Sequence, residues 1–219
     1  MSSHKTHPCL SFPLKDRVRF QLVAFSSSRF WSLIDYVCCR LPKLSIVYEK
    51  AIKQEYIIEY KLLPLTKQTK VMHIGCGSYP FTDITLAKSS AVDTIIGIDT
   101  NKQSVENAQK VIECEHLEKK ISIETGNGVD YDLSQFDIII ISSCSWPKVI
   151  ILDNLFKNAK IGCLFIIREL DLAVEPIEKC IKRHEEITLQ KRLFHHPFPF
   201  VKPFGWQTFY VKKIKKRKK

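Results

Sequence analysis

The sequence has no apolar run long enough to cross a membrane. The stretch 18–41 is apolar in part, but Arg19, Arg29, Asp35 and Arg40 interrupt it, and each uninterrupted run is far shorter than the ~20 residues that a membrane-spanning helix needs. The first residues also lack the apolar segment and small-residue cleavage site of a secretory signal. We therefore predict a protein without a membrane span that stays in the cytoplasm.

The sequence also lacks cysteine pairs of the C-x-x-C type. Its eight cysteines are scattered, and several lie in apolar runs, where a thiol acts as a small hydrophobic side chain. This spacing argues against zinc-binding and disulfide-rich frameworks and predicts a reducing compartment. The adjacent His195 and His196 would point apart on a strand, and no further ligand keeps suitable spacing with them, so we predict no metal site.

Acidic residues are not in excess. The formal net charge is +11, from 34 basic and 23 acidic residues. Seven of the basic residues lie within 212–219, and the remaining chain carries a charge of only +4. A basic cluster at a chain end is suited to RNA or another polyanion, so a partner of this kind would be bound by the tail and not by the body of the protein.

Glycine is scarce, with 7 residues in 219, so its positions are informative. Gly75 and Gly77 follow the apolar run Val71–Ile74, which predicts a strand that ends in a tight turn, because glycine bends freely and lets a ligand approach the backbone. Pro80 suits the first turn of a following helix. Pro80 also stands where a dinucleotide-binding turn has its third glycine, which argues against a nicotinamide cofactor.

A second strand, Thr94–Asp99, ends in a carboxylate. Asp99 follows the glycine turn by roughly 20 residues, the spacing at which doubly wound folds present an acid to ribose hydroxyls. The turn and this acid together predict a nucleotide-binding site.

Strand-like and helix-like segments alternate through the rest of the chain. This alternation predicts a parallel sheet with helices on its faces. Two final strand-like runs are joined by a proline-rich segment with no helix, which predicts an antiparallel hairpin. Strands are expected at 120–125, 136–142, 162–168, 187–195 and 206–212, and helices at 82–87, 104–114 and 148–159.

Before the glycine turn, apolar residues recur at helical spacing over 29–41 and 48–63, which predicts two helices that pack on the sheet and partly cover the site. Glu55 and Glu59 could reach into that site, but a solvated helix face is the favoured interpretation for either. The apolar stripe of the second helix comprises Tyr48, Ile52, Tyr56 and Leu63.

The predicted fold class is α/β: a Rossmann-like, doubly wound sheet of seven mostly parallel strands with an antiparallel last strand, preceded by a short helical extension. We expect an N-terminal arm and helices over 1–64, a cofactor-binding domain over 65–212 and a basic tail over 213–219.

This arrangement resembles the fold of class I S-adenosylmethionine-dependent methyltransferases over residues 70–212. The resemblance implies S-adenosylmethionine as cofactor, with its methionine end at the glycine turn, its ribose at Asp99 and its adenine facing Asn127, whose amide replaces an acid often found there. The sequence departs from the family at His73, where many members have an acid, and at Tyr79, where many have a glycine. The implied cofactor-binding residues are His73, Gly75, Cys76, Gly77, Tyr79, Asp99, Thr100, Asn127, Gly128 and Ser143.

A narrower resemblance lies in Gly75–Thr82, with the sequence Gly-Cys-Gly-Ser-Tyr-Pro-Phe-Thr. It is similar to the G-x-G-x-x-P-x-T turn of nicotianamine synthases and related opine-metallophore enzymes. Those enzymes transfer the aminopropyl or aminobutanoyl arm of S-adenosylmethionine to a nucleophile, in place of its methyl group. The helix at 48–63 and Arg168 also fit that group, whereas the N-terminal region is shorter.

The segment Ser142–Pro147 follows the fourth strand, where this fold places the acceptor. It lacks the Asn/Asp-Pro-Pro-Tyr pattern of enzymes that methylate adenine N6. Cys144 would be a nucleophile only as a thiolate, and a packed thiol is the competing interpretation. A histidine in the aromatic hairpin loop would accept a proton if that loop closes over substrate. The catalytic candidates are Tyr79, Cys144, His195, His196 and Glu59.

The sequence thus predicts an S-adenosylmethionine-dependent transferase, with methyl transfer to a small molecule or another acceptor as the first hypothesis. Aminopropyl or aminobutanoyl transfer, as in nicotianamine synthases, is the alternative. A third hypothesis is a non-catalytic module of the same fold that its basic tail holds to RNA or another polyanion.

Overall fold

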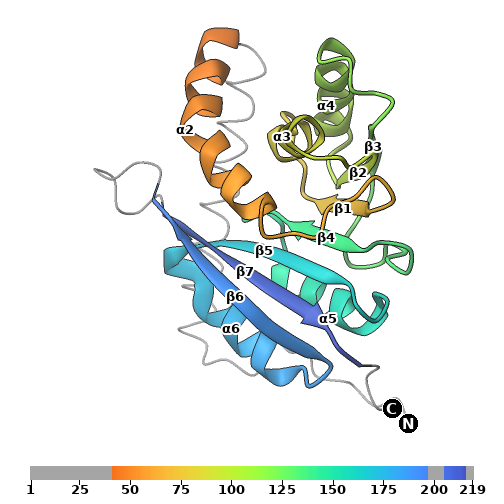
Figure 1. Cartoon of the computed structure of the whole chain (residues 1–219), viewed down its shortest axis with the longest axis vertical. Helices are drawn as coiled ribbons and strands as arrows, with labels where there is room; N and C mark the ends of the chain where they lie inside the picture. The colour runs from red at the N-terminus through yellow and green to blue at the C-terminus, as the bar shows by residue number, and fades with distance from the viewer. Residues whose placement is uncertain (1–40, 197–204, 216–219) are drawn as a thin grey trace.

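A computed structural model describes residues 41–196 and 205–215 of the chain (Figure 1). The predicted arm and first helix, most of the hairpin loop and the end of the basic tail lie outside the described residues. No helix within the described ranges combines the length and apolarity needed to cross a membrane.

A seven-stranded sheet forms the centre of the molecule, with strand order β3-β2-β1-β4-β5-β7-β6. β7 is antiparallel to both of its neighbours, and the other pairs are parallel. The predicted doubly wound sheet with an antiparallel last strand is therefore confirmed. Its strands are β1 Lys70–Ile74, β2 Thr94–Asp99, β3 Ile121–Thr125, β4 Ile138–Ile141, β5 Leu164–Leu170, β6 Ile187–His195 and β7 Trp206–Lys213.

Helices cover both faces of the sheet (Figure 1). α2, α3 and α4 lie on one side, and α5 and α6 lie on the other. The sequence analysis missed α6, although its buried Ile177, Cys180 and Ile181 keep helical spacing. The helices are α2 Pro42–Tyr60, α3 Phe81–Ser89, α4 Lys102–Cys114, α5 Lys148–Asn158 and α6 Val174–Arg183, with a short 3₁₀ turn at Asp171–Ala173.

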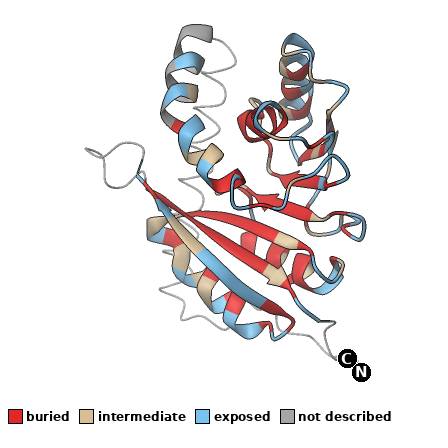
Figure 2. Cartoon of the chain, in the orientation of Figure 1, coloured by how far each residue is buried: buried red, intermediate tan, exposed pale blue. Residues whose placement is uncertain are grey.

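The central strands are apolar on both faces, as Figure 2 shows by their burial. Because successive side chains of a strand point to opposite faces, Ile139 and Ile141 of β4 pack with α5, whereas Ile138 and Ile140 pack with α3 and α4. The same alternation turns His73 of β1 and Arg168 of β5 toward the face that α2 and α3 cover. Two polar side chains of the central strands thus enter this buried layer.

Arg168 meets a buried carboxylate from α2. Glu59 has no exposed surface, and its Oε2 accepts hydrogen bonds from Arg168 Nε at 2.9 Å and Nη2 at 2.7 Å. The expectation that Glu59 lies on a solvated helix face was wrong. The helical stripe that contains Ile52 and Tyr56 faces the protein, and Glu59 lies on the same side, one helical turn beyond Tyr56.

The rest of the Glu59 carboxylate is bound by β7. Oε1 accepts hydrogen bonds from the Thr208 hydroxyl and, at 3.4 Å, from Trp206 Nε1. Tyr210 donates its hydroxyl to the Glu59 backbone carbonyl at 3.1 Å. One side chain therefore joins α2 to β5 and β7, which lie far from it in the sequence.

We predict that Glu59→Gln lowers the free energy of unfolding by about 3–5 kcal/mol, because it leaves the Arg168 charge buried without a counter-charge. Urea denaturation would measure this loss. Lys53→Gln, an exposed change on the same helix, should stay within about 0.5 kcal/mol of the parent. The double change Glu59→Leu with Arg168→Met should recover much of the loss, since no unpaired charge then remains. A fully stable Glu59→Gln protein would contradict the importance of the ion pair.

Candidate functional site

The glycine turn after β1 has the backbone that the sequence predicted. Gly75 and Gly77 have φ angles of 79° and 69°, in the left-handed region that side chains disfavour. The N–H groups of Gly75 and Cys76 both donate to the Ile98 carbonyl, at 2.8 and 3.1 Å. A Cβ on Gly75 would lie 2.5 Å from Ser145 Oγ. The turn is therefore held against β2, and no side chain fits at Gly75.

Asp99 lies at the end of β2, directly beside this turn. Its Oδ2 accepts the Gly77 N–H at 3.1 Å, and its Oδ1 accepts the Asn101 N–H at 2.9 Å. Asn101 in turn caps α4 by accepting the N–H groups of Gln103 and Ser104. The carboxylate is thus fixed in orientation while remaining partly exposed.

A cavity of about 780 Å³, here called the cofactor cavity, opens over the turn and Asp99. Asn127 reaches it from the loop after β3; its Oδ1 accepts the Val129 N–H at 3.0 Å, which leaves Nδ2 as the donor toward a ligand. Six predicted cofactor-binding residues line this cavity: Gly75, Gly77, Asp99, Thr100, Asn127 and Gly128. The sequence analysis missed Asn101, Gln103, Ser104 and Asn107 of the same wall, although their position directly after Asp99 was a usable signal.

These residues fit S-adenosylmethionine chemically. A carboxylate suits a ribose diol, an amide donor suits a ring nitrogen of adenine, and a side-chain-free turn admits the methionine end close to the backbone. The β1–β4 boundary is also where the strand order reverses, the usual ligand position in an open α/β sheet.

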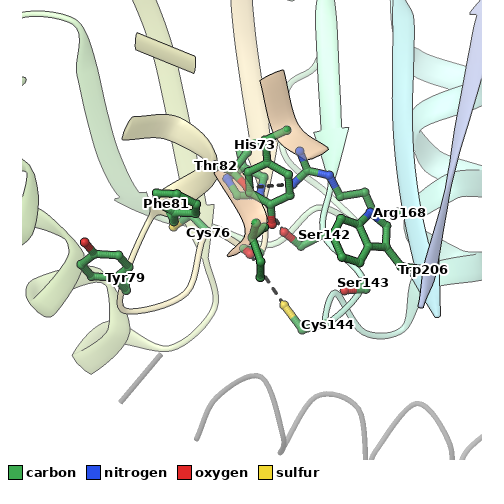
Figure 3. Close-up of a pocket in the computed structure, with 13 residues that line it drawn as sticks. His73, Cys76, Tyr79, Phe81, Thr82, Ser142, Ser143, Cys144, Arg168 and Trp206 are labelled. Carbon is green, nitrogen blue, oxygen red and sulfur yellow. Dashed lines mark hydrogen bonds between the residues drawn. The ribbon is translucent and has the colours of Figure 1, made fainter. Parts of the chain in front are cut away.

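A second, smaller cavity of about 60 Å³, here called the inner cavity, lies between the turn and α2 (Figure 3). It shares Gly75 and Cys144 with the cofactor cavity. The structure places four predicted cofactor-binding residues in this second cavity: His73, Cys76, Tyr79 and Ser143. Its remaining lining residues are Ile52, Tyr56, Phe81, Thr82, Ser142, Arg168 and Trp206.

Arg168 forms one wall of the inner cavity, where Figure 3 shows it facing Thr82. Its Nη1 donates to Thr82 Oγ1 at 2.7 Å, and its guanidinium lies 3.9 Å from the centre of the Tyr56 ring. Burial by itself would lower the pKa of Arg168, but the Glu59 carboxylate raises it above the ordinary value. The cavity wall therefore carries a permanent positive charge that is already paired.

Tyr79 and Cys144, two of the catalytic candidates, lie at the inner cavity. Tyr79 donates its hydroxyl to the Glu49 carboxylate. The Cys144 thiol donates to the Gly75 carbonyl at 3.8 Å. Cys144 lies at the junction of the two cavities.

His195 and His196, the other histidine candidates, line neither cavity. His195 is buried, stacks on Trp206 with ring centres 4.8 Å apart, and pairs through Nδ1 with Glu55 Oε2 at 2.7 Å. Glu55 is 26% exposed and is accordingly half-buried and paired, not fully solvated. His196 Nε2 lies 3.9 Å from Asp171. The described part of this hairpin end agrees with the packing interpretation.

Asp153, Cys180 and His184 bring metal-binding atom types within 4.8 Å of one another between α5 and α6. His184 Nε2 bonds Asp153 Oδ1 at 2.6 Å, and its Nδ1 bonds Glu186 at 2.9 Å. Burial raises the pKa of the Cys180 thiol to about 12. The three residues of this cluster line neither cavity.

One polar group that the sequence analysis did not assign is Asp83, which has no exposed surface and lies in the first turn of α3. It bonds His73, which also bonds Ser142. Nothing in the local pattern distinguishes Asp83 from an acid that simply favours a helix start.

We predict that Asp99→Ala weakens S-adenosylmethionine binding by about 1.5–3 kcal/mol for each charge-assisted hydrogen bond lost. Calorimetry on the folded variant would measure the change. Asp93→Ala is the matched control, because Asp93 is a half-exposed acid just before the other end of β2, paired with Lys120. Equal affinities in the two variants would remove Asp99 from the cofactor site.

Gly77→Ala should reduce the affinity for S-adenosylmethionine at least tenfold, because a side chain at the turn occupies ligand space. The positive φ adds a conformational cost of about 1–2 kcal/mol. Gly162→Ala is the control. It has a similar conformational cost, because the φ of Gly162 is 90°, but nothing lies within 4 Å of the added Cβ. Both variants should lose stability and only Gly77→Ala should lose affinity. Unchanged binding by Gly77→Ala would mean that the ligand does not approach this turn.

Solved structures of similar fold support the architecture. MtNAS, in a variant form, aligns with 93% of this chain and 78% of its own at 15% identity, with a TM-score of 0.72. A complex of that variant with S-adenosylmethionine aligns over 79% of this chain and 74% of the other at 17% identity, with a TM-score of 0.59. StiE O-MT aligns over 74% of each chain at 14% identity, with a TM-score of 0.56. At these identities the likeness establishes the fold.

A search of curated protein sequences finds no match to this chain. The family model described as "Nicotianamine synthase protein" matches residues 47–197, more than half of the 219 residues. The matched segment extends from within α2 past the end of β6 and contains both cavities except Trp206. The chain belongs to the nicotianamine synthase family.

Proposed function

We propose that this S-adenosylmethionine-dependent transferase moves the aminobutanoyl arm of its cofactor to a nucleophile. The observation that carries the proposal is the extent of the family match. The residues that enclose the inner cavity, Trp206 excepted, lie within the matched segment. The likeness to nicotianamine synthases therefore includes the side of the site where an acceptor would bind, and not only the glycine turn.

In this proposal the cofactor cavity binds S-adenosylmethionine and the inner cavity binds the acceptor. In the cofactor cavity, Asp99 would hold the ribose, Asn127 the adenine and the Gly75–Gly77 turn the methionine end. The inner cavity would hold the acceptor nucleophile. The cavities meet at Gly75 and Cys144, and this junction is where we place the transfer.

S-adenosylmethionine supplies a sulfonium whose attached carbons are electrophilic. In the proposed reaction the bond from the acceptor to the arm forms while the bond from the arm to sulfur breaks, and sulfur keeps the electron pair. The coproduct is then methylthioadenosine. Tyr56, Phe81 and Trp206 line the small inner cavity, so the chain's main contribution is to position the acceptor and limit the entry of water.

Methyl transfer is the second candidate. It is supported by the fold likeness to StiE O-MT and by the position of the inner cavity at the end of β4, where this fold commonly places acceptors. It would use the same residues, but its coproduct would be S-adenosylhomocysteine. The hypothesis of a non-catalytic module on RNA concerns the basic tail, most of which lies outside the described residues.

The coproduct distinguishes these candidates without knowledge of the acceptor. We expect the full chain, incubated with S-adenosylmethionine and the small-molecule fraction of a cell extract, to release methylthioadenosine, measured by mass spectrometry. Asp99→Ala should slow the release at limiting cofactor, and Asp93→Ala should not. Release of S-adenosylhomocysteine alone would replace the proposal by methyl transfer. Cofactor binding without either coproduct would favour the non-catalytic module.

A further inference from the structure

His73 forms two hydrogen bonds that lead from the protein interior to the wall of the inner cavity. Its Nδ1 lies 2.8 Å from Asp83 Oδ2, and its Nε2 lies 2.7 Å from Ser142 Oγ. His73 is 2% exposed and Asp83 is fully buried. The order of hydroxyl, imidazole and carboxylate is the one by which unrelated enzymes activate a hydroxyl group.

Three separate elements of the fold bring these residues together. His73 points from β1 toward α3, and Asp83 lies in the first turn of α3. Ser142 follows directly after β4, which pairs with β1 and places Ile140 opposite His73. The trio therefore lies at the carboxyl edge of the sheet, where the strand order reverses and where both cavities open.

With Asp83 ionised, the two hydrogen bonds of His73 have one consistent arrangement of protons. An ionised carboxylate only accepts, so Nδ1 of His73 carries the proton that faces Asp83. Nε2 then accepts the Ser142 hydroxyl proton. The Ser142 oxygen keeps lone pairs with which to accept a hydrogen bond from a ligand in the cavity that it lines.

Asp83 has a feature that packing alone does not explain. Its second oxygen, Oδ1, is buried and has no hydrogen-bond partner among the described residues. Burying a carboxylate with one oxygen unbonded is costly. The cost is offset when a positive charge forms on His73, because the attraction between two charges at this distance is strong away from water.

Several other polar side chains of the inner cavity are occupied by different partners. Arg168 is held by Glu59 and Thr82, Tyr79 donates to Glu49, and the Cys144 thiol donates to Gly75. His73 is the only imidazole among the described residues that line this cavity. Ser142 lies beside Gly75, the residue common to both cavities: a Cβ on Gly75 would come within 3.5 Å of the Ser142 Cβ.

We propose that Ser142, His73 and Asp83 form a proton relay that serves the transfer reaction, and that the acceptor is an amine or hydroxyl with a proton to lose. The proposal rests on the transferase function. As the acceptor–carbon bond forms and the carbon–sulfur bond breaks, the acceptor proton passes to Ser142 Oγ and the Ser142 proton passes to His73 Nε2. Ser142 ends neutral, and the His73 imidazolium faces Asp83. Ser142 is the catalytic residue that touches the acceptor, and Asp83 is a positioning residue.

Ser142→Ala tests the relay in the full chain with the coproduct assay. We expect kcat for coproduct release to fall by about 10²–10⁴, the usual loss when acid–base assistance is removed, while the affinity for S-adenosylmethionine stays within about threefold. Ser122→Ala is the matched control, because Ser122 is an exposed serine of β3 that lines neither cavity and does not bond His73. Its rate should stay within about threefold of the parent.

Proton NMR of the full chain provides a second measurement that does not depend on turnover. The His73 Nδ1 proton should resonate far downfield, disappear in His73→Gln and move upfield in Asp83→Asn. The spectrum of His73→Gln separates it from the protons of His184 and His195, which also pair with carboxylates.

The possible results distinguish failure of the proton relay from failure of the proposed function. If the wild-type protein releases S-adenosylhomocysteine, the aminobutanoyl proposal fails, but the relay is still measured by the rate of Ser142→Ala relative to Ser122→Ala, because either transfer frees one proton. If the protein releases methylthioadenosine and Ser142→Ala is as fast as Ser122→Ala, the function stands and the relay is overturned. Absence of the downfield His73 signal overturns the relay, whatever the rate of coproduct release. A protein that forms neither coproduct overturns both proposals.

Discussion

The site depends on the buried ion pair between Glu59 and Arg168. It joins α2 to β5, and through Thr208 and Trp206 it also engages β7. An unpaired charge at this depth would cost several kcal/mol, so the pair specifies where α2 lies. With α2 in that place, Ile52 and Tyr56 close the inner cavity. The helix that covers the inner cavity is thus positioned by electrostatics as well as by apolar contact.

A second constraint acts at the sheet edge. The left-handed glycines and Asp99 bind each other through the backbone, so the cofactor cavity is shaped before any ligand enters. Gly75 belongs to both cavities and has no space for a side chain. In the proposed reaction, the same residue would admit the cofactor to the turn and let the Ser142 hydroxyl lie next to the reacting atoms. Preorganisation of this kind reduces the reorganisation that a transfer reaction requires.

The sequence predicted the structure correctly where the feature depends on residues close together in the chain. Alternating strands and helices, the glycine turn and the carboxylate that ends β2 are periodic or positional patterns, and the structure has them within a few residues of the expected bounds. The amphipathic α6 carried the same kind of signal and was overlooked. The prediction of a solvated helix face for Glu59 and Glu55 missed their partners for a different reason. A charged residue on a helix usually faces water, and the exception is decided by an arginine or a histidine more than a hundred residues away.

The sequence by itself determined the fold class, the order of the central elements and six of the residues around the cofactor cavity, because backbone propensity and hydrophobic period are properties of neighbouring residues. The tertiary structure alone decided which polar side chains meet in the buried layer. His73, Asp83 and Ser142 come from β1, α3 and the end of β4, and no spacing in the chain predicts their hydrogen bonds. Their partnership arises from strand register and from the face to which each side chain points, and both are fixed only when the sheet and its helices assemble.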